Sequence, residues 1–226
     1  MIKFKAVSKL YNDNVVALDN VSFYIKSGEF VSLVGQSGAG KTTLVKMLIG
    51  EENPSEGRIE VGGWDITRLR GSEVPHLRRQ IATIFQDYKL LPKKTLLENV
   101  EFALQVCGKS MKKIKLVAPQ VMRIVGLESK MHRYPHEVSG GERQRTAIAR
   151  SLVYQPKILL ADEPTGNLDS INAKEIVDLL LKINSFGTTV VLVTHNRDVV
   201  NKLRKRVLTL HEGRLVSDQA VGKYII

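Results

Sequence analysis

The feature that most restricts the fold of this chain is a glycine-rich octet at residues 35–42, with the sequence Gly-Gln-Ser-Gly-Ala-Gly-Lys-Thr. It fits the pattern of a phosphate-binding loop, since it follows an apolar segment and precedes a helical pattern. The glycines let backbone N–H groups turn inward around a phosphate, and the next helix presents the positive end of its dipole. Lys41 would reach the β- and γ-phosphates, and the Thr42 hydroxyl would bind Mg²⁺. We therefore predict an ATP site formed by Gly35, Gln36, Ser37, Gly38, Ala39, Gly40, Lys41, Thr42 and Thr43.

A second apolar segment, residues 158–161, ends in two adjacent carboxylates, Asp162 and Glu163. In α/β sheets, ligands bind at the carboxyl ends of the strands. Asp162 would hold Mg²⁺ through water, and Glu163, pointing differently, would accept a proton from the attacking water. Alone, the pattern also fits a strand that enters a polar turn; together with the octet we interpret it as the hydrolytic half of the site.

Strand-like and helix-like segments alternate along the rest of the chain. Residues 42–49 and 173–183 have helical spacing of apolar residues. This alternation predicts an α/β fold with a mainly parallel sheet. The expected strands are residues 2–7, 21–25, 30–34, 58–61, 81–85, 158–161, 189–193, 206–210 and 214–216, the last two joined by a turn at residues 212–213.

Residues 96–152 differ from this pattern, because no convincing strand interrupts them. Apolar residues recur there at helical spacing, which predicts a helical insertion in the α/β domain. The two apolar series are Leu97, Val100, Leu104 and Cys107, then Val117, Val121, Ile124 and Val125.

Composition sets broad limits. Apolar residues make up 43% of the chain, enough for a core, and no apolar run is long enough to span a membrane. No apolar segment follows the first lysines, so we expect no signal peptide. The single cysteine, Cys107, is expected to be a small buried hydrophobe. The net charge of +11 favours phosphates, acidic lipids or nucleic acid, or else reflects only a solvated surface.

Residues 138–145, Val-Ser-Gly-Gly-Glu-Arg-Gln-Arg, resemble the LSGGQ-type signature of ABC ATPases. Gln86 after a strand, the Asn-Leu-Asp string at 167–169 and His195 after another strand occupy the places of the family's Q-loop, D-loop and switch histidine. Tyr11 lies where the family stacks an aromatic ring on adenine. The resemblance covers nearly the whole chain.

The resemblance implies a P-loop core with an N-terminal antiparallel β subdomain and a helical subdomain at about residues 87–156, all within one domain of residues 1–226. It implies catalytic roles for Lys41, Gln86, Glu163 and His195, with Thr42, Gln86 and Asp162 near Mg²⁺. Each residue also has a plainer interpretation. Tyr11 could be a half-buried strand tyrosine, Gln86 a surface amide and His195 a structural histidine.

In this family the signature residues contact the ATP that is held by another subunit. The resemblance therefore implies a homodimer, packed head to tail when ATP is bound, in which Ser139, Gly140, Gly141 and Glu142 reach the partner's nucleotide. Ser139 could also cap the next helix, and the two roles are compatible. Val138 replaces the usual leucine and Arg143 the usual glutamine, so the effect of Arg143 on the dimer is open.

The strings at residues 74–81, 85–92, 162–169 and 194–200, and the basic tract at 202–207, resemble the FtsE-type ATPases of bacterial cell division. This implies a polytopic FtsX-type membrane partner, a peripheral location on the cytoplasmic face of the membrane and a role in septation. Lipoprotein-releasing and macrolide-export ATPases share the string at 163–169 and remain an alternative.

Two surface features have two interpretations each. Residues 90–92, Leu-Leu-Pro, could be an exposed contact for the membrane partner or could pack under the helical insertion. Residues 204–206, Arg-Lys-Arg, could contact anionic lipids or form a solvated face. Nucleic acid is not an expected partner, since ABC proteins of that kind usually have two ATPase domains or a long coiled coil.

Overall fold

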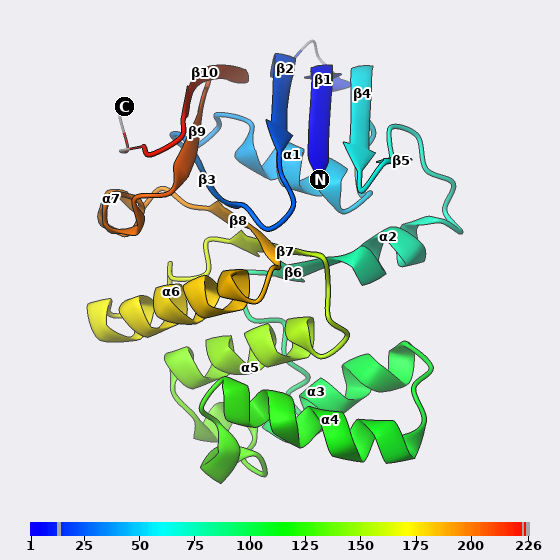
Figure 1. Ribbon diagram of the computed structural model, residues 1–226, viewed down its shortest axis with the longest axis vertical. Helices are drawn as coiled ribbons and strands as arrows, with labels where there is room; N and C mark the ends of the chain where they lie inside the picture. The colour runs from blue at the N-terminus through cyan, green and yellow to red at the C-terminus, as the bar shows by residue number, and fades with distance from the viewer. Residues whose placement is uncertain (13–14, 223, 225–226) are drawn as a thin grey trace.

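The computed structural model describes residues 1–12, 15–222 and 224. Two β-sheets lie in one half of the molecule and most of the helices in the other (Figure 1). This arrangement is the expected α/β fold, with an antiparallel subdomain beside a mainly parallel sheet.

The central sheet has the strand order β10-β9-β3-β8-β7-β6. Neighbouring strands run parallel except for the β9–β10 hairpin at one edge. All five residues of β3 and of β8 are buried, as is usual for parallel strands covered on both faces. The strands are β3 (Phe30–Val34), β6 (Ile81–Ile84), β7 (Ile158–Asp162), β8 (Thr189–Val193), β9 (Arg206–His211) and β10 (Arg214–Gln219).

The second sheet is antiparallel, with the order β2-β1-β4-β5. Its strands are β1 (Ile2–Leu10), β2 (Val16–Ile25), β4 (Glu56–Val61) and β5 (Trp64–Asp65). Helix α1 (Lys41–Leu48) packs against both sheets in one hydrophobic core, where Leu44 and Leu48 are almost fully buried. This core fixes the start of α1, and with it the glycine-rich octet, against the carboxyl end of β3.

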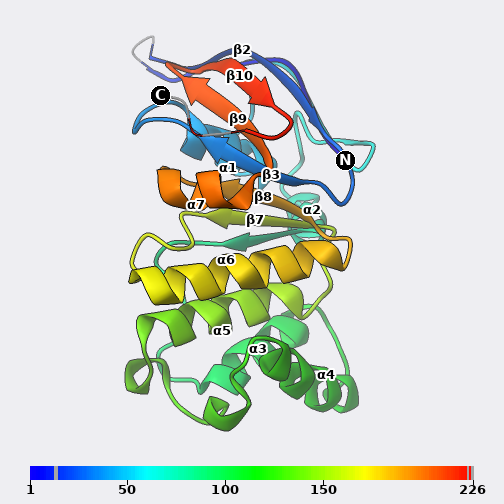
Figure 2. The same ribbon diagram turned by 60° about the vertical axis from the view of Figure 1, so that its left-hand side comes forward.

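A helical segment connects β6 to β7. It contains α3 (Leu96–Val106), α4 (Met111–Ile124) and α5 (Gly140–Leu152), with short 3₁₀ turns at Glu128–Lys130 and Pro135–Glu137. Helix α5 lies between α6 (Ser170–Ser185) on one side and α3 and α4 on the other, as Figure 2 shows. These four helices share a second hydrophobic core with one face of the central sheet.

The apolar face of α4 differs in part from the prediction. The buried residues are Ile114, Ala118, Val121 and Met122, whereas Ile124 is 47% exposed. At about 100° per residue, the four buried side chains lie within about 100° of one another around the helix, and Ile124 lies outside this face, about 60° beyond Val121. Cys107 follows the last turn of α3 and is half-buried, so the expectation of a buried cysteine is wrong.

Two short helices were not predicted, α2 (Val74–Gln80) and α7 (Arg197–Leu203). No helix in the described part of the chain is long and apolar enough to cross a bilayer.

Candidate functional site

The glycine-rich octet connects β3 to α1. Gly40 precedes the helix with φ of 98°, a left-handed conformation that suits glycine. A Cβ at this position would lie 2.5 Å from the carbonyl oxygen of Ala17 in β2. The turn is therefore possible only because this residue has no side chain.

The ammonium group of Lys41 lies within the loop. Its Nζ donates to the carbonyl oxygens of Gly35 (2.7 Å) and Gln36 (2.8 Å). Burial lowers the pKa of Lys41, and the nearby carboxylates of Glu163 and Asp162 oppose that shift. The cation is thus held at the point where phosphate oxygens would replace the two carbonyl groups as its partners.

Asp162 is the last residue of β7, and it faces the same region. Burial and the neighbouring charge of Glu163 raise the pKa of Asp162, while Lys41 opposes the shift. A half-buried carboxylate with a raised pKa, close to a lysine, suits a site that binds a cation and phosphates.

Glu163 points differently from Asp162 because its backbone is left-handed, with φ of 46°. Its carboxylate is oriented by residues at the end of β8. The Thr194 hydroxyl donates to Oε2 (3.1 Å), and the backbone N–H of His195 donates to Oε1 (3.0 Å). The Nδ1 atom of His195 lies 2.6 Å from the same Oε1. The sequence prediction that Glu163 and His195 belong to one site thus corresponds to a direct contact.

These residues surround a single open hollow of about 780 Å³. Gly35 and Ala39 of the octet are not among its described lining residues. The predicted residues that line it are Tyr11, Gln36, Ser37, Gly38, Gly40, Lys41, Thr42, Thr43, Gln86, Asp162, Glu163 and His195.

Sequence reasoning missed five lining residues, Val15, Val16, Ala17, Arg197 and Tyr224. Arg197 lies two residues after His195, the switch-histidine position. This closeness in sequence is the one signal that could have indicated that Arg197 lines the hollow. Its guanidinium lies 5.2 Å from the ring of Tyr224, close to the end of the chain. Tyr11 also lines the hollow, with Lys9 Nζ 5.0 Å from its ring centre.

The predicted signature residues start α5, away from the hollow. Ser139 caps this helix: its hydroxyl accepts from the backbone N–H of Glu142, whose carboxylate accepts from the Ser139 N–H. A Cβ on Gly141 would lie 2.1 Å from Asn172 Oδ1, so the close approach of α6 requires glycine there. Among the described residues lining the hollow, none comes from positions 139–142. The chain does not bring its own signature residues to its own phosphate loop.

The Q-loop position is linked to the D-loop position. Gln86 is exposed after β6, and its backbone carbonyl accepts from Asn167 Nδ2 (3.3 Å). Its amide nitrogen would lie 3.0 Å from a Cβ on Gly166. The loops after β6 and β7 are therefore in contact at the edge of the hollow.

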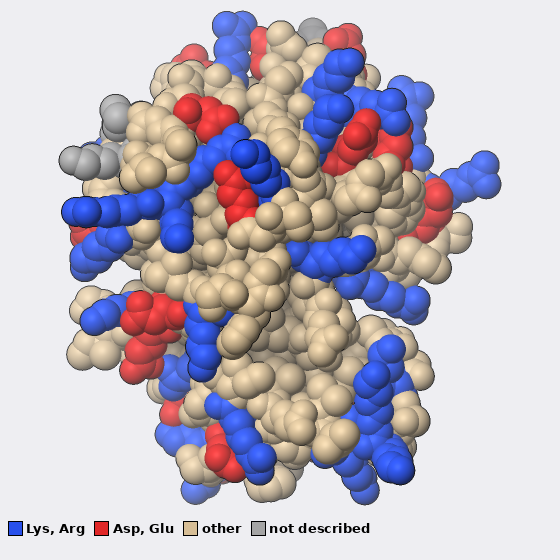
Figure 3. Space-filling model, in the orientation of Figure 1, with Lys and Arg blue, Asp and Glu red and all other residues tan. Residues whose placement is uncertain are grey.

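Two segments with open interpretations, residues 90–92 and residues 204–206, can now be placed in the structure. In residues 90–92, both leucines are half-buried, and the backbone of Leu91 pairs with the side chain of Asn99. In residues 204–206, the side chain of Arg206 pairs with Glu29 and Asp218, which raises its pKa. Arg206 is thus not an open lipid contact, which leaves Arg204 and Lys205 exposed. Basic side chains are scattered with acidic ones over the face seen in Figure 3.

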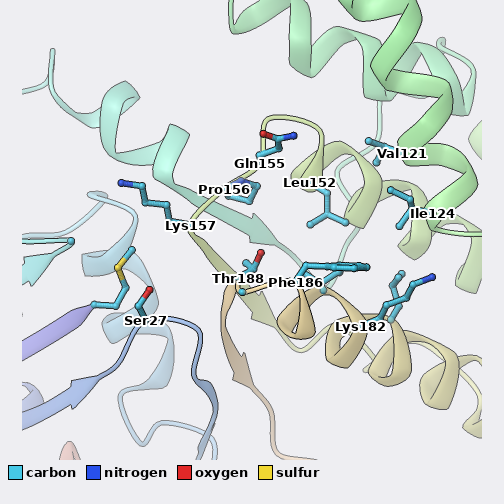
Figure 4. Close-up of a pocket in the computed structure, with 15 residues that line it drawn as sticks. Ser27, Val121, Ile124, Leu152, Gln155, Pro156, Lys157, Lys182, Phe186 and Thr188 are labelled. Carbon is cyan, nitrogen blue, oxygen red and sulfur yellow. The ribbon is translucent and has the colours of Figure 1, made fainter.

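A second hollow of about 740 Å³ lies at the amino ends of β7 and β8. In Figure 4, Phe186, Leu152 and Ile124 lie on one side of it and Lys157 on the other. Its described lining residues include no carboxylate and no predicted site residue. Its position, at the strand ends opposite Asp162 and His195, separates it from the nucleotide chemistry.

Comparison with known proteins is consistent with this geometry. Residues 18–166 match the family model described as ABC transporter. The chain is 46% identical over 224 residues to the cell division ATP-binding protein FtsE of Streptococcus pneumoniae, covering 99% of this chain and 97% of that one. It is 47% identical over 225 residues to FtsE of Mycobacterium tuberculosis, covering 99% and 98%.

Two solved structures are similar to the whole fold. The dimeric post-hydrolysis structure of the ATP-binding cassette MJ0796, bound to ADP and Pi, is 36% identical, with a TM-score of 0.88 and coverage of 99% of this chain and 100% of that one. CbiO1 of Clostridium perfringens, part of the ABC transporter complex cbiONQ, is 30% identical, with a TM-score of 0.91 and coverage of 97% and 88%. The chain belongs to the ABC transporter family and is one of its ATP-hydrolysing subunits.

Proposed function

We propose that this chain is the ATPase subunit of a membrane-associated ABC complex that acts in cell division. In this proposal, ATP-driven dimerisation is coupled to a polytopic FtsX-type partner that regulates cell-wall hydrolysis. The observation that carries the proposal is the similarity over 99% of the chain to proteins named FtsE. The arrangement of the hollow around Lys41, Asp162 and Glu163 supplies the chemistry that such a role requires.

ATP binding would begin at the octet. The backbone N–H groups of the loop and the start of α1 would surround the β-phosphate, and Lys41 Nζ would exchange its two carbonyl partners for phosphate oxygens. Tyr11, half-buried at the rim, would stack on the adenine ring.

The residues present fit Mg²⁺. Thr42, Gln86 and Asp162 offer hydroxyl, amide and carboxylate oxygens in one hollow, which suits a hard cation that keeps several of its waters. Among the described residues no group of three or more His, Cys, Asp or Glu side chains could hold a metal alone, so binding would depend on the phosphates. When bound, Mg²⁺ would neutralise charge that develops on the β- and γ-phosphates.

Hydrolysis would use Glu163 as the base. A water oxygen attacks the γ-phosphorus, the bond to the β-phosphate oxygen breaks, and Glu163 accepts the proton that the water loses. The Thr194 hydroxyl and the His195 N–H hold the carboxylate in one orientation. The exposed His195 ring would contact the γ-phosphate, and Gln86 would report its presence to the loop after β6.

The site would be completed by a second copy. Ser139, Gly140, Gly141 and Glu142 lie at a helix N-terminus outside their own hollow, and such a terminus binds anions. In the proposed dimer, these residues close over the ATP of the partner. The similarity to a dimeric ABC cassette supports this arrangement.

A groove beside the Q-loop would receive the membrane partner. It lies between α2, α3 and α5, has a volume of about 390 Å³, and is lined by Leu91, Phe102, Val106 and Tyr154 among others, with Arg78 and Arg79 at its rim. Phe102 and Val106 are exposed apolar residues, which suits a short amphipathic helix from the partner. This contact would place the chain at the cytoplasmic face of the membrane.

Identifying the membrane partner tests the proposal. The chain, carrying Glu163→Gln and an affinity tag, would be purified from detergent-solubilised membranes with ATP, and the bound membrane protein identified by mass spectrometry. We expect an FtsX-type protein, with the yield reduced by Phe102→Asp in the groove and unaffected by Phe186→Asp in the second hollow. Recovery of an exporter or lipoprotein-releasing permease would instead favour the alternative, which the similarity to a transporter cassette supports.

A further inference from the structure

Tyr88 connects the loop after β6 to the helix that carries the signature residues. Both Tyr88 and Lys89 have left-handed backbones, with φ of 56° and 46°. Side chains other than glycine rarely adopt this conformation, and it persists where the surroundings determine it. The loop after Gln86 therefore has a defined shape.

Arg150 of α5 holds this shape. Its guanidinium donates to the carbonyl oxygen of Tyr88 (2.9 Å) and also to that of Lys89. A planar guanidinium with several donors is suited to gripping two adjacent carbonyl groups. The Q-loop is thus tied to α5 at its backbone.

The side chain of Tyr88 makes a second link, to Arg143. The guanidinium of Arg143 lies 5.5 Å from the centre of the Tyr88 ring, within the range of a cation–π contact. The same guanidinium donates to the carbonyl oxygens of Val138 (2.8 Å) and Pro135 (3.3 Å), just before the signature turn. One side chain therefore contacts both the Q-loop and the segment that leads into Ser139.

Tyr88 also lies close to the signature turn itself. Its hydroxyl oxygen is 3.2 Å from the point where a Cβ on Gly140 would be. Gln86, two residues earlier, lines the ATP hollow and bonds to Asn167. The path from the hollow to the signature turn thus consists of contacts between described residues.

We propose that the contact between Arg143 and Tyr88 holds the signature turn in the position from which it closes over the partner's ATP. Both are positioning residues, and the inference rests on the proposed composite dimer.

The test is a double-mutant cycle on ATP-dependent dimerisation. Arg143→Gln, Tyr88→Leu and the double variant are each made in the Glu163→Gln background, and the dimer dissociation constant is measured by sedimentation velocity with saturating ATP and Mg²⁺. An exposed cation–π contact is worth about two- to fivefold, and a symmetric dimer contains it twice, so each single variant should weaken the dimer about four- to 25-fold. The double variant should be weakened by less than the product of the two single effects, because both single variants remove the same cation–π contact.

Further measurements separate positioning from folding. Tyr88→Phe keeps the aromatic ring and should dimerise as tightly as its parent. Arg123→Gln is the matched control for Arg143→Gln, because it removes an arginine charge from an exposed ion pair elsewhere on the helical segment. Binding of a fluorescent ATP analogue to the monomer should be unchanged in all variants. The thermal unfolding midpoint should stay above the assay temperature in each of them, although Arg143→Gln also removes two hydrogen bonds to backbone carbonyl groups. Additive effects in the double variant, or a dimer as tight as the parent in Arg143→Gln, would overturn this inference alone. A Glu163→Gln parent that fails to dimerise would overturn the proposed composite site as well.

Discussion

The imidazole Nδ1 of His195 lies 2.6 Å from Glu163 Oε1, and the backbone N–H of His195 donates to the same oxygen. The two residues follow neighbouring parallel strands, β7 and β8, which are in register at Asp162 and Val193. Adjacent carboxyl ends of a parallel sheet thus bring together the proposed base and the group that orients it. Groups of the chain itself thus orient the carboxylate.

Glu163→Gln should abolish turnover and retain ATP binding. The amide keeps the shape of the side chain and loses the ability to accept a proton. General-base catalysis contributes about 10²–10⁴-fold, so kcat should fall by at least about 10². Steady-state phosphate release and equilibrium binding of a fluorescent ATP analogue would measure the two effects, with Glu128→Gln, in an exposed ion pair, as the control. A large loss of ATP affinity would contradict the role assigned to Glu163.

His195→Ala should also act on turnover more than on binding. It removes the group beside Glu163 and the γ-phosphate contact, while the backbone N–H that orients Glu163 remains. Loss of one donor to a developing anion costs about 10²–10³ in kcat. Single-turnover hydrolysis would measure it, with His76→Ala, exposed on α2, as the matched control. Turnover equal to that of the parent would show that the ring has only a structural role.

Lys41→Ala should have the opposite profile. Removing a charged hydrogen-bond donor to phosphate costs about 1.5–3 kcal/mol, which corresponds to about a tenfold to hundredfold loss of ATP affinity. The fold should persist, because Lys41 is half-buried and its two carbonyl partners can bond to water. Titration with the fluorescent ATP analogue checks this, and Lys112→Ala, exposed on α4, is the control. If Lys41→Ala and Glu163→Gln bound ATP equally weakly, the division of roles between them would be wrong.

The inner strands of the central sheet could be predicted from sequence because almost all of their residues are buried. Mostly apolar segments such as 30–34 and 189–193 are typical of a parallel strand covered on both faces. The octet and the Asp162–Glu163 pair could be predicted for the related reason that each motif lies at the end of such a strand. Helices α2 and α7 have only seven residues each, with one and two buried side chains, so a helical period cannot be recognised in them.

The missed contacts of the site depend on tertiary structure. Tyr224 reaches the hollow only because the chain returns there after β10, and no local pattern indicates this. The contact of Arg143 with Tyr88 joins residues on either side of two helices. Spacing along the chain gives no information about such a pair, although it did identify the Q-loop position and the signature string.

Asp162→Asn should stabilise the nucleotide-free protein at neutral pH. Burial and the charge of Glu163 raise the pKa of Asp162 in the folded state. At pH values between the unfolded pKa of about 3.8 and this raised pKa, the native state therefore binds more protons than the unfolded state. In this window the free energy of unfolding falls as pH rises, and the whole penalty is present above the folded pKa. The asparagine variant lacks the penalty.

Urea denaturation from pH 4 to pH 8, without nucleotide or Mg²⁺, would measure this effect. The difference in unfolding free energy between Asp162→Asn and the parent should be small at pH 4, should grow as pH rises through the folded pKa, and should then stay constant. A variant that is less stable than the parent at pH 8 would show that Lys41 stabilises the ionised carboxylate by more than burial and Glu163 destabilise it.

The dependence of ATPase activity on protein concentration tests the composite site most directly. If each ATP is cleaved only when a second copy's Ser139 turn covers it, phosphate release per chain should rise steeply with protein concentration and level off once the dimer forms. Sedimentation under the same conditions would report the monomer and dimer fractions. Constant activity per chain, from protein that sedimentation shows to be monomeric throughout, would contradict the account.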